Sequence, residues 1–319
     1  MTSRLGKGEP AGYKKANKRK INGVLVLDKP IGATSNAALQ IVKRLFEAAK
    51  AGHTGSLDPL ATGVLPLCFG EATKFSQYLL EANKRYLATF KLGVATTTGD
   101  AEGEIMATAE VPSLELDEID TVLNQFRGKI EQTPSMYSAL KVNGQPLYKL
   151  ARQGIEVERK SREVTILRYD VLEYENDLLK VDIECTKGTY VRSLAEDLGK
   201  VLGCGAHVAE LRRIKSGPYE VAASVTIAEL EKMKEEGGLA PLDALLLPVE
   251  SSIADWPAIN LTELTAGYFK QGQAVQVAHV PSSGLVRIFS EVESNDPVFI
   301  GVGEILEDGK VAPRRLVVS

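Results

Sequence analysis

The stretch that organises this sequence is Gly52-His53-Thr54-Gly55-Ser56-Leu57-Asp58-Pro59-Leu60-Ala61-Thr62-Gly63. It is rich in turn-forming residues and carries a single carboxylate, that of Asp58. On its N-terminal side Ser35 can cap a helix, because apolar residues follow it at helical spacing: Ala38, Ile41, Val42, Leu45 and Phe46. On its C-terminal side comes the apolar segment 64–69. We therefore expect 52–63 to be a loop that leads from a helix into an apolar segment.

Toward the N-terminus, residues 23–27 are typical of a short buried strand, which the turn-forming residues 28–32 end. Residues 1–20 carry seven Lys or Arg side chains against one acid, Glu9, whereas the rest of the chain has 31 basic and 41 acidic side chains. We expect 1–20 to be a disordered basic tail and order to begin at Ile21. Such a tail can reach phosphates or can simply be solvated, and charge alone does not decide between the two.

Toward the C-terminus, the pattern predicts helices and strands without a regular strand–helix repeat. Helices are expected at about 71–80, 116–126, 146–153 and 190–202, and strands at about 86–92, 163–175, 178–187 and 208–215. Asn176-Asp177 would form a turn, and Gly203-Cys204-Gly205 would stop the last helix. This order favours an α+β fold with a mixed, largely antiparallel sheet and flanking helices.

A second unit is expected after the polar linker 250–257. Short β-like segments follow at about 274–279, 284–290, 297–303 and 309–318, separated by Gly, Pro, Ser and Asp. That pattern is typical of a small β-barrel. We therefore divide the chain into the tail 1–20, a first domain at 21–249 and a second domain at 250–319. A length of 319 residues agrees with two domains.

Composition restricts the compartment and the chemistry. The three cysteines are far apart in the sequence, which favours a reducing compartment. No apolar run approaches the ~20 residues that span a bilayer, and the start has no signal-peptide core, so we expect a cytoplasmic protein without a membrane segment. Phosphate-loop, dinucleotide-binding and nucleophile-elbow motifs are absent, and the histidines and cysteines lack zinc spacing. We expect neither a metal nor a cofactor.

The loop leaves two interpretations of Asp58 open. A carboxylate in a Gly-rich loop with His, Thr and Ser nearby can be catalytic. An Asp before Pro is also a common way to start a turn. His53 is similarly ambiguous, since most lone histidines are structural or exposed.

The motifs together resemble those of the TruB-type tRNA pseudouridine synthases. The loop 52–63 is similar to the family signature, and Asn22-Gly23 through Lys29-Pro30-Ile31-Gly32 is similar to its opening strand and K-P-x-G loop. Later matching blocks are Lys84-Arg85-Tyr86, Pro134-Ser135-Met136-Tyr137-Ser138-Ala139-Leu140-Lys141, Lys187-Gly188-Thr189-Tyr190-Val191-Arg192 and Gly203-Cys204-Gly205-Ala206-His207 followed by Leu211-Arg212-Arg213. The resemblance runs from about Ile21 to the C-terminus, where 311–316 ends a segment similar to a PUA module.

The resemblance implies a reaction and roles for individual residues. The family isomerises the uridine at position 55, in the T-loop of tRNA, to pseudouridine, without a cofactor. Asp58 would be the nucleophile or base, Arg192 would keep it ionised, and Tyr190 would assist removal of the C5 proton. The implied substrate contacts are Tyr86 stacking on the uracil, Leu211 lining its pocket, and His53 filling space beside the extruded nucleotide. On pattern alone, Lys29 and Lys74 are either phosphate contacts or ordinary surface lysines.

The implied partner is tRNA, bound through its T-loop and acceptor arm by a monomer with no obligatory protein partner. A non-enzymatic alternative is a tRNA-folding chaperone that uses the same surface. An enzymatic alternative is a hydrolase that cleaves the N-glycosidic bond and releases the base.

Overall fold

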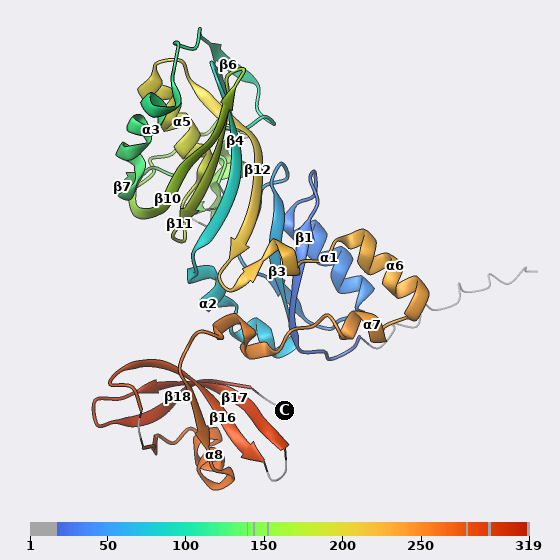
Figure 1. Cartoon of the computed structure of the whole chain (residues 1–319). Coiled ribbons are helices and arrows are strands. Elements are labelled where there is room, and N and C mark those ends of the chain that lie inside the picture. Colours follow the sequence, from blue (N-terminus) through green and yellow to red (C-terminus); the bar gives the residue numbers. More distant parts are fainter. Residues whose placement is uncertain are drawn as a thin grey trace, which may run out of the picture.

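The structure, a computed structural model, describes residues 18–317 except 139, 143, 152, 279, 293 and 294. In this part of the chain, nine strands form a large sheet and five C-terminal strands form a smaller one (Figure 1). The predicted α+β class, with a mixed and largely antiparallel sheet, flanking helices and a small C-terminal β domain, is confirmed.

The main path of the large sheet runs β1-β3-β12-β4-β11-β10-β7. These strands are β1 (Gly23–Lys29), β3 (Thr62–Phe69), β12 (Ala206–Ser216), β4 (Lys84–Leu92), β11 (Leu178–Cys185), β10 (Arg162–Glu175) and β7 (Gly128–Gln132). Two short strands extend it: β2 (Ala51–His53) pairs with β3, and β13 (Tyr219–Glu220) pairs with β12. Its pairings are antiparallel except that of β3 with β12, which is parallel. That parallel pairing brings the end of the 52–63 loop beside β12.

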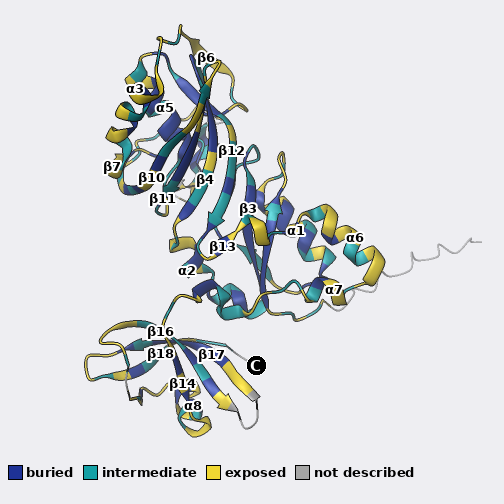
Figure 2. Ribbon diagram, in the orientation of Figure 1, coloured by how far each residue is buried: buried dark blue, intermediate teal, exposed yellow. Residues whose placement is uncertain are grey.

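Two groups of helices cover the large sheet (Figures 1 and 2). Helices α3 (Leu116–Leu123) and α5 (Val191–Leu202) pack with β4, β10 and β11 around one core. Helices α1 (Ser35–Leu45), α6 (Ile227–Gly237) and α7 (Ala240–Asp243) pack on β1 and β3 around a second core. Each helix buries the side on which its apolar residues recur. The two cores hold the strands on either side of the β3–β12 junction.

The structure has a turn and a helix end at two places where the sequence predicts them. Asn176 and Asp177 have φ of 52° and 61°, the left-handed values that a tight hairpin between β10 and β11 requires. Gly203 ends α5 with φ of 77°, where a side chain would be strained.

Other elements differ from the expectation. The cap of α1 is Thr34, whose side chain accepts from the Ala37 N–H, and Ser35 instead turns into the core. The helix predicted at 71–80 is divided into a 3-10 turn η1 (Gly70–Lys74) and α2 (Ser76–Glu81). The helix predicted at 146–153 is the shorter α4 (Leu147–Ala151), and α6 and α7 were not predicted. Two small hairpins also complete the first domain: β5 (Val94–Thr96) with β6 (Ile105–Thr108), and β8 (Lys141–Val142) with β9 (Gln145–Pro146).

The C-terminal sheet has the order β14-β16-β17-β18-β15. Its strands are β14 (Ala258–Leu261), β16 (Gly284–Val292), β17 (Asn295–Ile305), β18 (Lys310–Leu316) and β15 (Val275–Gln276), and α8 (Glu263–Lys270) packs against them. An apolar cluster with Phe75 on one side and Phe299 on the other joins this sheet to η1 and α2, with the two ring centroids 5.5 Å apart. The second sheet is therefore packed against the first domain.

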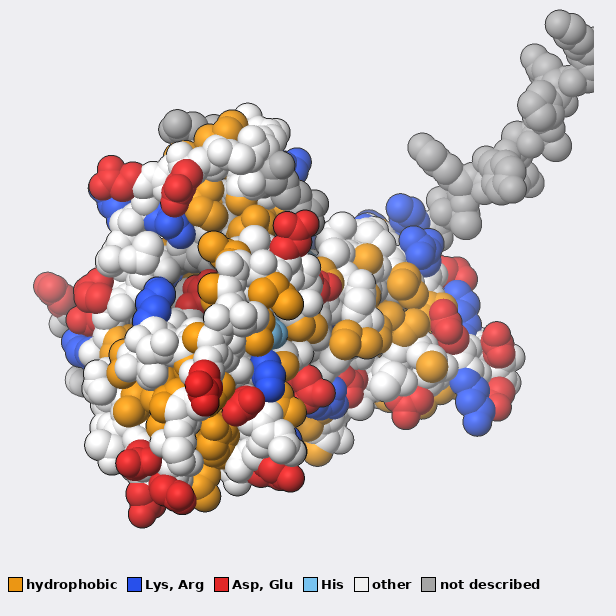
Figure 3. Space-filling model, turned by 90° about the horizontal axis from the view of Figure 1, so that it is seen from above, with side chains coloured by type: hydrophobic (Ala, Val, Ile, Leu, Met, Phe, Trp, Pro, Cys, Tyr) orange, Lys and Arg blue, Asp and Glu red, His pale blue; other side chains and the backbone are white. Residues whose placement is uncertain are grey.

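Contacts with the folded domain begin within the basic N-terminal segment. Arg19 pairs with Ala48 in a β-bridge and with the Asp243 carboxylate, so contacts begin two residues before Ile21, where we expected order to start. No helix among the described residues is long and apolar enough to cross a membrane. Seen from above, acidic and basic side chains are interspersed over the surface (Figure 3).

Candidate active site

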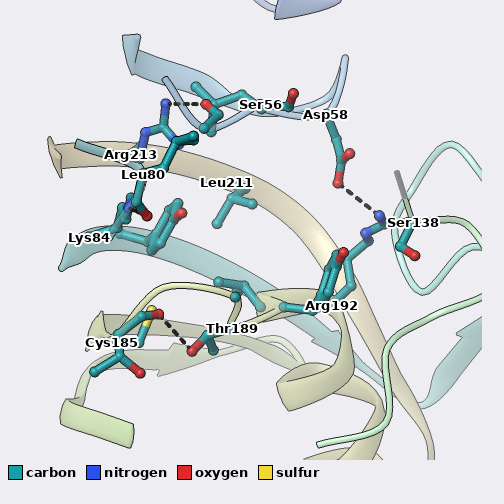
Figure 4. A pocket seen from close by; sticks show the side chains of 17 residues that line it. Ser56, Asp58, Leu80, Lys84, Ser138, Cys185, Thr189, Arg192, Leu211 and Arg213 are labelled. Atoms are coloured by element: carbon teal, nitrogen blue, oxygen red, sulfur yellow. Dashed lines mark hydrogen bonds and ion pairs between the residues drawn. The ribbon is translucent and has the colours of Figure 1, made fainter. Parts of the chain in front are cut away.

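A cavity of about 310 Å³ lies where the 52–63 loop, strands β4 and β12 and the start of α5 meet (Figure 4). That volume is at the lower end of the roughly 300–1,000 Å³ range of small-molecule pockets. The residues that line it are Gly55, Ser56, Leu57, Asp58, Leu80, Lys84, Tyr86, Ser138, Cys185, Thr186, Gly188, Thr189, Tyr190, Val191, Arg192, Leu211 and Arg213. Five of the eight residues singled out in the sequence are in this set: Asp58, Tyr86, Tyr190, Arg192 and Leu211.

An ion pair stands at one end of the cavity. The Oδ2 atom of Asp58 lies 3.0 Å from Nη2 of Arg192, and the Asp58 side chain is 44% exposed while that of Arg192 is 6% exposed. Arg192 is in the first turn of α5. Its guanidinium also donates to the carbonyls of Thr98 at 3.0 Å and Tyr137 at 3.2 Å. The cation is thus fixed from several sides and offers its remaining face to Asp58.

A second carboxylate, absent from our sequence analysis, completes the cluster. Asp100 is 4% exposed and its Oδ2 lies 3.5 Å from Nη1 of Arg192. The turn between β5 and β6 holds Asp100 in place, because Thr98 and the N–H of Glu102 donate to its other oxygen. Its local sequence is that of an ordinary turn, so only the tertiary contact reveals it.

Arg192 and Asp100 act in opposite directions on the acidity of Asp58. Withdrawal from water into the cavity is the main influence and raises the pKa of the Asp58 carboxyl. The guanidinium of Arg192 lowers that pKa, whereas Asp100 raises it. Arg192 is therefore the largest influence that favours the ionised carboxylate.

Buried side chains fix the loop that carries Asp58. Ser35 is 3% exposed; its hydroxyl donates to the Leu57 carbonyl at 3.0 Å and accepts from the Leu57 N–H at 2.7 Å. On the other side of Asp58, the Gly32 N–H donates to the Pro59 carbonyl at 2.8 Å. The backbone on both sides of the carboxylate is thereby anchored to the first domain.

Lys29 has a different place from the one we expected. We expected a phosphate contact, but Lys29 is fully buried, at 0% exposure. Its ammonium donates to the carbonyls of Pro30 at 2.9 Å, Ala33 at 2.6 Å and Pro59 at 3.4 Å. Burial lowers its pKa to about 8, opposed by Asp58. The expectation was wrong because tertiary packing covers the K-P-x-G loop, and Lys29 supports the Asp58 loop instead.

Tyr86, Leu211 and Tyr190 form walls of the cavity. Tyr86 on β4 and Leu211 on β12 face it from neighbouring strands, and burial raises the pKa of the Tyr86 hydroxyl. The backbone of Tyr190 exchanges two hydrogen bonds with the buried Gln132 side chain, of 2.7 Å and 3.0 Å. The guanidinium of Arg162 lies 4.9 Å from the centre of the Tyr190 ring. These contacts hold Tyr190 in position at the cavity.

His53 and Lys74 lie outside the cavity lining. His53 is at the end of β2; its Nδ1 is buried and finds no hydrogen-bond partner among the described residues. Burial and the nearby Arg213 lower its pKa, which favours the neutral imidazole. Lys74 pairs with Glu71 at 2.6 Å and donates to the Leu316 carbonyl at 3.0 Å, so it joins the two domains. In the described part of the chain, no group of three or more His, Cys, Asp or Glu side chains is placed to hold a metal.

Three family profiles match the chain in succession between residues 43 and 317. Residues 43–191 match the TruB family pseudouridylate synthase N-terminal domain. Residues 192–254 match the tRNA pseudouridylate synthase B C-terminal domain, and residues 257–317 match the C-terminal domain of pseudouridine synthase II TruB.

Curated relatives are similar over nearly their full length. The tRNA pseudouridine synthase B of Ectopseudomonas mendocina (strain ymp) is 56% identical over 300 residues, which cover 94% of this chain and 96% of that protein. The protein of the same name from Stutzerimonas stutzeri (strain A1501) is 55% identical, covering 95% of this chain and 97% of that protein.

Solved structures share the fold. A chain of a Cbf5-Nop10-Gar1 complex superposes with a TM-score of 0.70 at 27% identity, covering 93% of this chain and 84% of that one. A chain of an H/ACA RNP bound to a substrate RNA containing 2′-deoxyuridine gives 0.69 at 25% identity, covering 93% and 85%.

Proposed function

The chain belongs to the TruB family of pseudouridine synthases and converts uridine to pseudouridine in tRNA, and we propose that its target is the uridine at position 55 in the T-loop. The resemblance of the 52–63 loop to the family signature supports this target. So does the high identity to synthase B relatives over nearly the whole chain.

The reaction is an isomerisation. The bond between C1′ of the ribose and N1 of the uracil breaks, the base turns, and C5 bonds to C1′. C5 loses a proton and N1 gains one, so no electron or group enters from outside. The protein must take the nucleotide out of its stack, hold it, and place charge beside the breaking bond. A cavity of about 310 Å³ supports the proposal because it accepts one nucleoside rather than a helix.

The observation that carries the proposal is the pair of Asp58 and Arg192, 3.0 Å apart at one end of that cavity. A carboxylate kept ionised by a neighbouring guanidinium can attack C1′ as a nucleophile or remove a sugar proton as a base. Its partial exposure lets a sugar from outside approach it.

The residues that line the cavity would bind the uracil base. We assign Tyr86 to stacking on the uracil, an interaction worth about 1–3 kcal/mol per base, and Leu211 to its apolar wall. Tyr190 lies on the same cavity and is the candidate to assist loss of the C5 proton. His53, behind the lining, is assigned to filling space beside the extruded nucleotide.

The second domain has a separate role in this proposal. We take 21–249 as the catalytic domain and 250–319 as a PUA-like domain that holds the acceptor arm by its shape and phosphates. The protein would act in the cytoplasm as a monomer without an obligatory protein partner.

The test is to map pseudouridine in unmodified tRNA after incubation with the pure protein. Conversion is expected at position 55. Asp58→Asn should abolish it and leave tRNA affinity within a few-fold, because the substitution changes a charge but little volume. Asp197→Asn is the matched control, since that aspartate pairs with Lys200 on the exposed side of α5. Both variants should fold.

Four other outcomes would contradict the proposal. Modification at a different position would remove the T-loop target. A normal rate with Asp58→Asn would remove Asp58 from the mechanism. Release of free uracil would make the protein a glycosidase, and tRNA refolding with no conversion would make it a chaperone.

A further inference from the structure

The end of the cavity opposite Asp58 holds two cations, Lys84 and Arg213 (Figure 4). Lys84 begins β4 and is 7% exposed; Arg213 is on the neighbouring β12 and is 1% exposed. A β carbon placed on Gly55 would lie 3.5 Å from Nη1 of Arg213 and 3.9 Å from Cε of Lys84. Both side chains therefore approach the backbone of the 52–63 loop where it lines the cavity.

Neither cation is paired with a carboxylate in the part of the chain that the structure describes. Arg213 donates to the carbonyls of Val64 at 2.7 Å and Gly55 at 3.0 Å. Lys84 donates to three carbonyls at the end of α2, those of Leu79, Leu80 and Ala82. These are neutral acceptors, so neither positive charge has a carboxylate in direct contact, and Glu81 acts on Lys84 only from a distance.

The residues next to these two cations in sequence do have carboxylate partners. Arg85, next to Lys84, pairs with Asp182. Arg212, next to Arg213, pairs with Asp28 at 2.6 Å. On alternating strand positions, the outward arginines have carboxylate partners and the cavity-facing cations do not.

Burying a cation without a paired carboxylate is energetically costly, and this cost lowers the pKa of the group. Burial, together with the charge of Arg213, lowers the pKa of Lys84 to about 8. An isolated buried cation would be expected to acquire a counter-charge or to be replaced. The cavity between these cations and Asp58 is lined by Tyr86 and Leu211, which carry no charge at neutral pH. An anion bound inside the cavity would compensate the positive charges of Lys84 and Arg213.

Resting on the proposed function, we propose that Arg213 and Lys84 stabilise the negative charge of the uracil while it is detached from the ribose. When the C1′–N1 bond breaks, its electron pair stays on the base, spread over N1 and the carbonyl oxygens. The charge is consumed when C5 bonds to C1′, after which C5 loses its proton and N1 takes one up. Since Asp58 must lie beside the sugar, the base extends toward the cationic end.

The alternative ligand, an RNA phosphate, fits less well. A phosphate needs direct contacts, whereas Lys84 has used its three donors and both cations are almost wholly buried. Fixed charges in a site with little water act on charge that develops nearby without direct contact.

The experiment compares single-turnover rates on tRNA with uridine or 5-fluorouridine at the target position. Fluorine withdraws electrons and stabilises the detached base, so the fluorinated target depends less on the protein's cations. We expect Arg213→Gln to slow loss of the target uridine by about 10²-fold and to slow loss of 5-fluorouridine much less. Arg213→Lys, which keeps the charge, should recover most of the rate on uridine.

Arg212→Gln is the matched control and should not change the ratio of the two rates. If Arg213→Gln does not fold, Lys84→Gln answers the same question, because its carbonyl partners belong to the end of α2 alone. Equal slowing on both targets would show a purely structural role and overturn the inference while leaving the synthase function intact. A wild-type protein that makes no pseudouridine would overturn the proposed function and, with it, the inference.

Discussion

Asp58 and Asp100 share one guanidinium: Asp58 lies 3.0 Å from Nη2 of Arg192, and Asp100 lies 3.5 Å from Nη1 of the same side chain. Asp100 is buried and fixed by its own turn, whereas Asp58 reaches the cavity. Asp100 thus holds the Arg192 guanidinium in place, and Asp58 is the carboxylate that pairs with this guanidinium at the cavity. Burial raises the pKa of Asp58, Arg192 opposes that rise, and Asp100 adds to it.

The shared guanidinium predicts opposite pH effects for two substitutions. Activity that needs the Asp58 carboxylate is present above its pKa and is lost as pH falls through it. Arg192→Gln removes the charge that lowers this pKa, so the acid limb of the rate profile should move to higher pH. Asp100→Asn removes a charge that raises it, so the limb should move to lower pH. Single-turnover rates across the acid range measure both, and movement in the same direction would contradict the arrangement.

The hydrogen bonds between Ser35 and Leu57 predict a loss of activity beyond the loss of stability. Ser35→Ala leaves two buried backbone groups without their partner, at a cost of about 1–3 kcal/mol. The Asp58 loop should loosen and the single-turnover rate should fall.

The control is the preceding residue. Thr34→Ala removes the cap of α1, which costs about 0.5–2 kcal/mol, but does not touch the loop. Urea unfolding should show both losses, whereas only Ser35→Ala should slow the reaction. Equal rates for the two variants would separate Ser35 from the site.

The burial of Lys29 predicts a structural rather than an RNA-binding phenotype. Lys29→Met should lower the free energy of unfolding by about 1–3 kcal/mol, because carbonyls that it now satisfies lose their donor. The salt dependence of tRNA affinity should stay unchanged, since a fully buried ammonium reaches no phosphate. Lys200→Met, at a lysine whose side chain is 73% exposed, should change neither quantity. A salt slope reduced by about 0.7–0.9, the value for one phosphate contact, would restore the original expectation.

The close approach of β3 to β12 predicts that Gly63 cannot be replaced. A β carbon there would lie 2.2 Å from the Arg213 carbonyl oxygen, at φ of +100°. Gly63→Ala should cost more than about 3 kcal/mol or prevent folding, because backbone on both sides must move. Gly32 has φ of +79° but no atom within 4 Å, so Gly32→Ala should cost only about 1–2 kcal/mol. Urea unfolding of both variants compares them, and equal losses would mean that conformation rather than contact decides.

The sequence predicts well those features that depend on local pattern. The hairpin turn at Asn176-Asp177 and the end of α5 at Gly203 follow from backbone conformations that few residues adopt. The α+β class follows from the irregular order of helical and strand patterns. Helices α6, α7 and α8 escaped prediction because they are short or weakly patterned, and packing rather than propensity stabilises them.

The site is predictable only in part, for a related reason. Asp58 and Arg192 were found through motifs, and the structure brings them together across 134 positions of sequence. Asp100 has no local signal, since it reaches Arg192 only because the β5–β6 turn pairs with β12. Lys29 was misplaced because sequence alone does not show which lysine the fold will cover. Arg213 was quoted in a motif, but its missing counter-charge is visible only in three dimensions.

The packing of Phe75 against Phe299, with Lys74 bonded to the Leu316 carbonyl, has a consequence for substrate choice. It ties the C-terminal sheet to η1 and α2 and so sets the distance between that sheet and the cavity. An RNA arm that engages both at once must match that distance. Under the proposed role of the second domain, the length of a stem rather than its base sequence would then select the RNA.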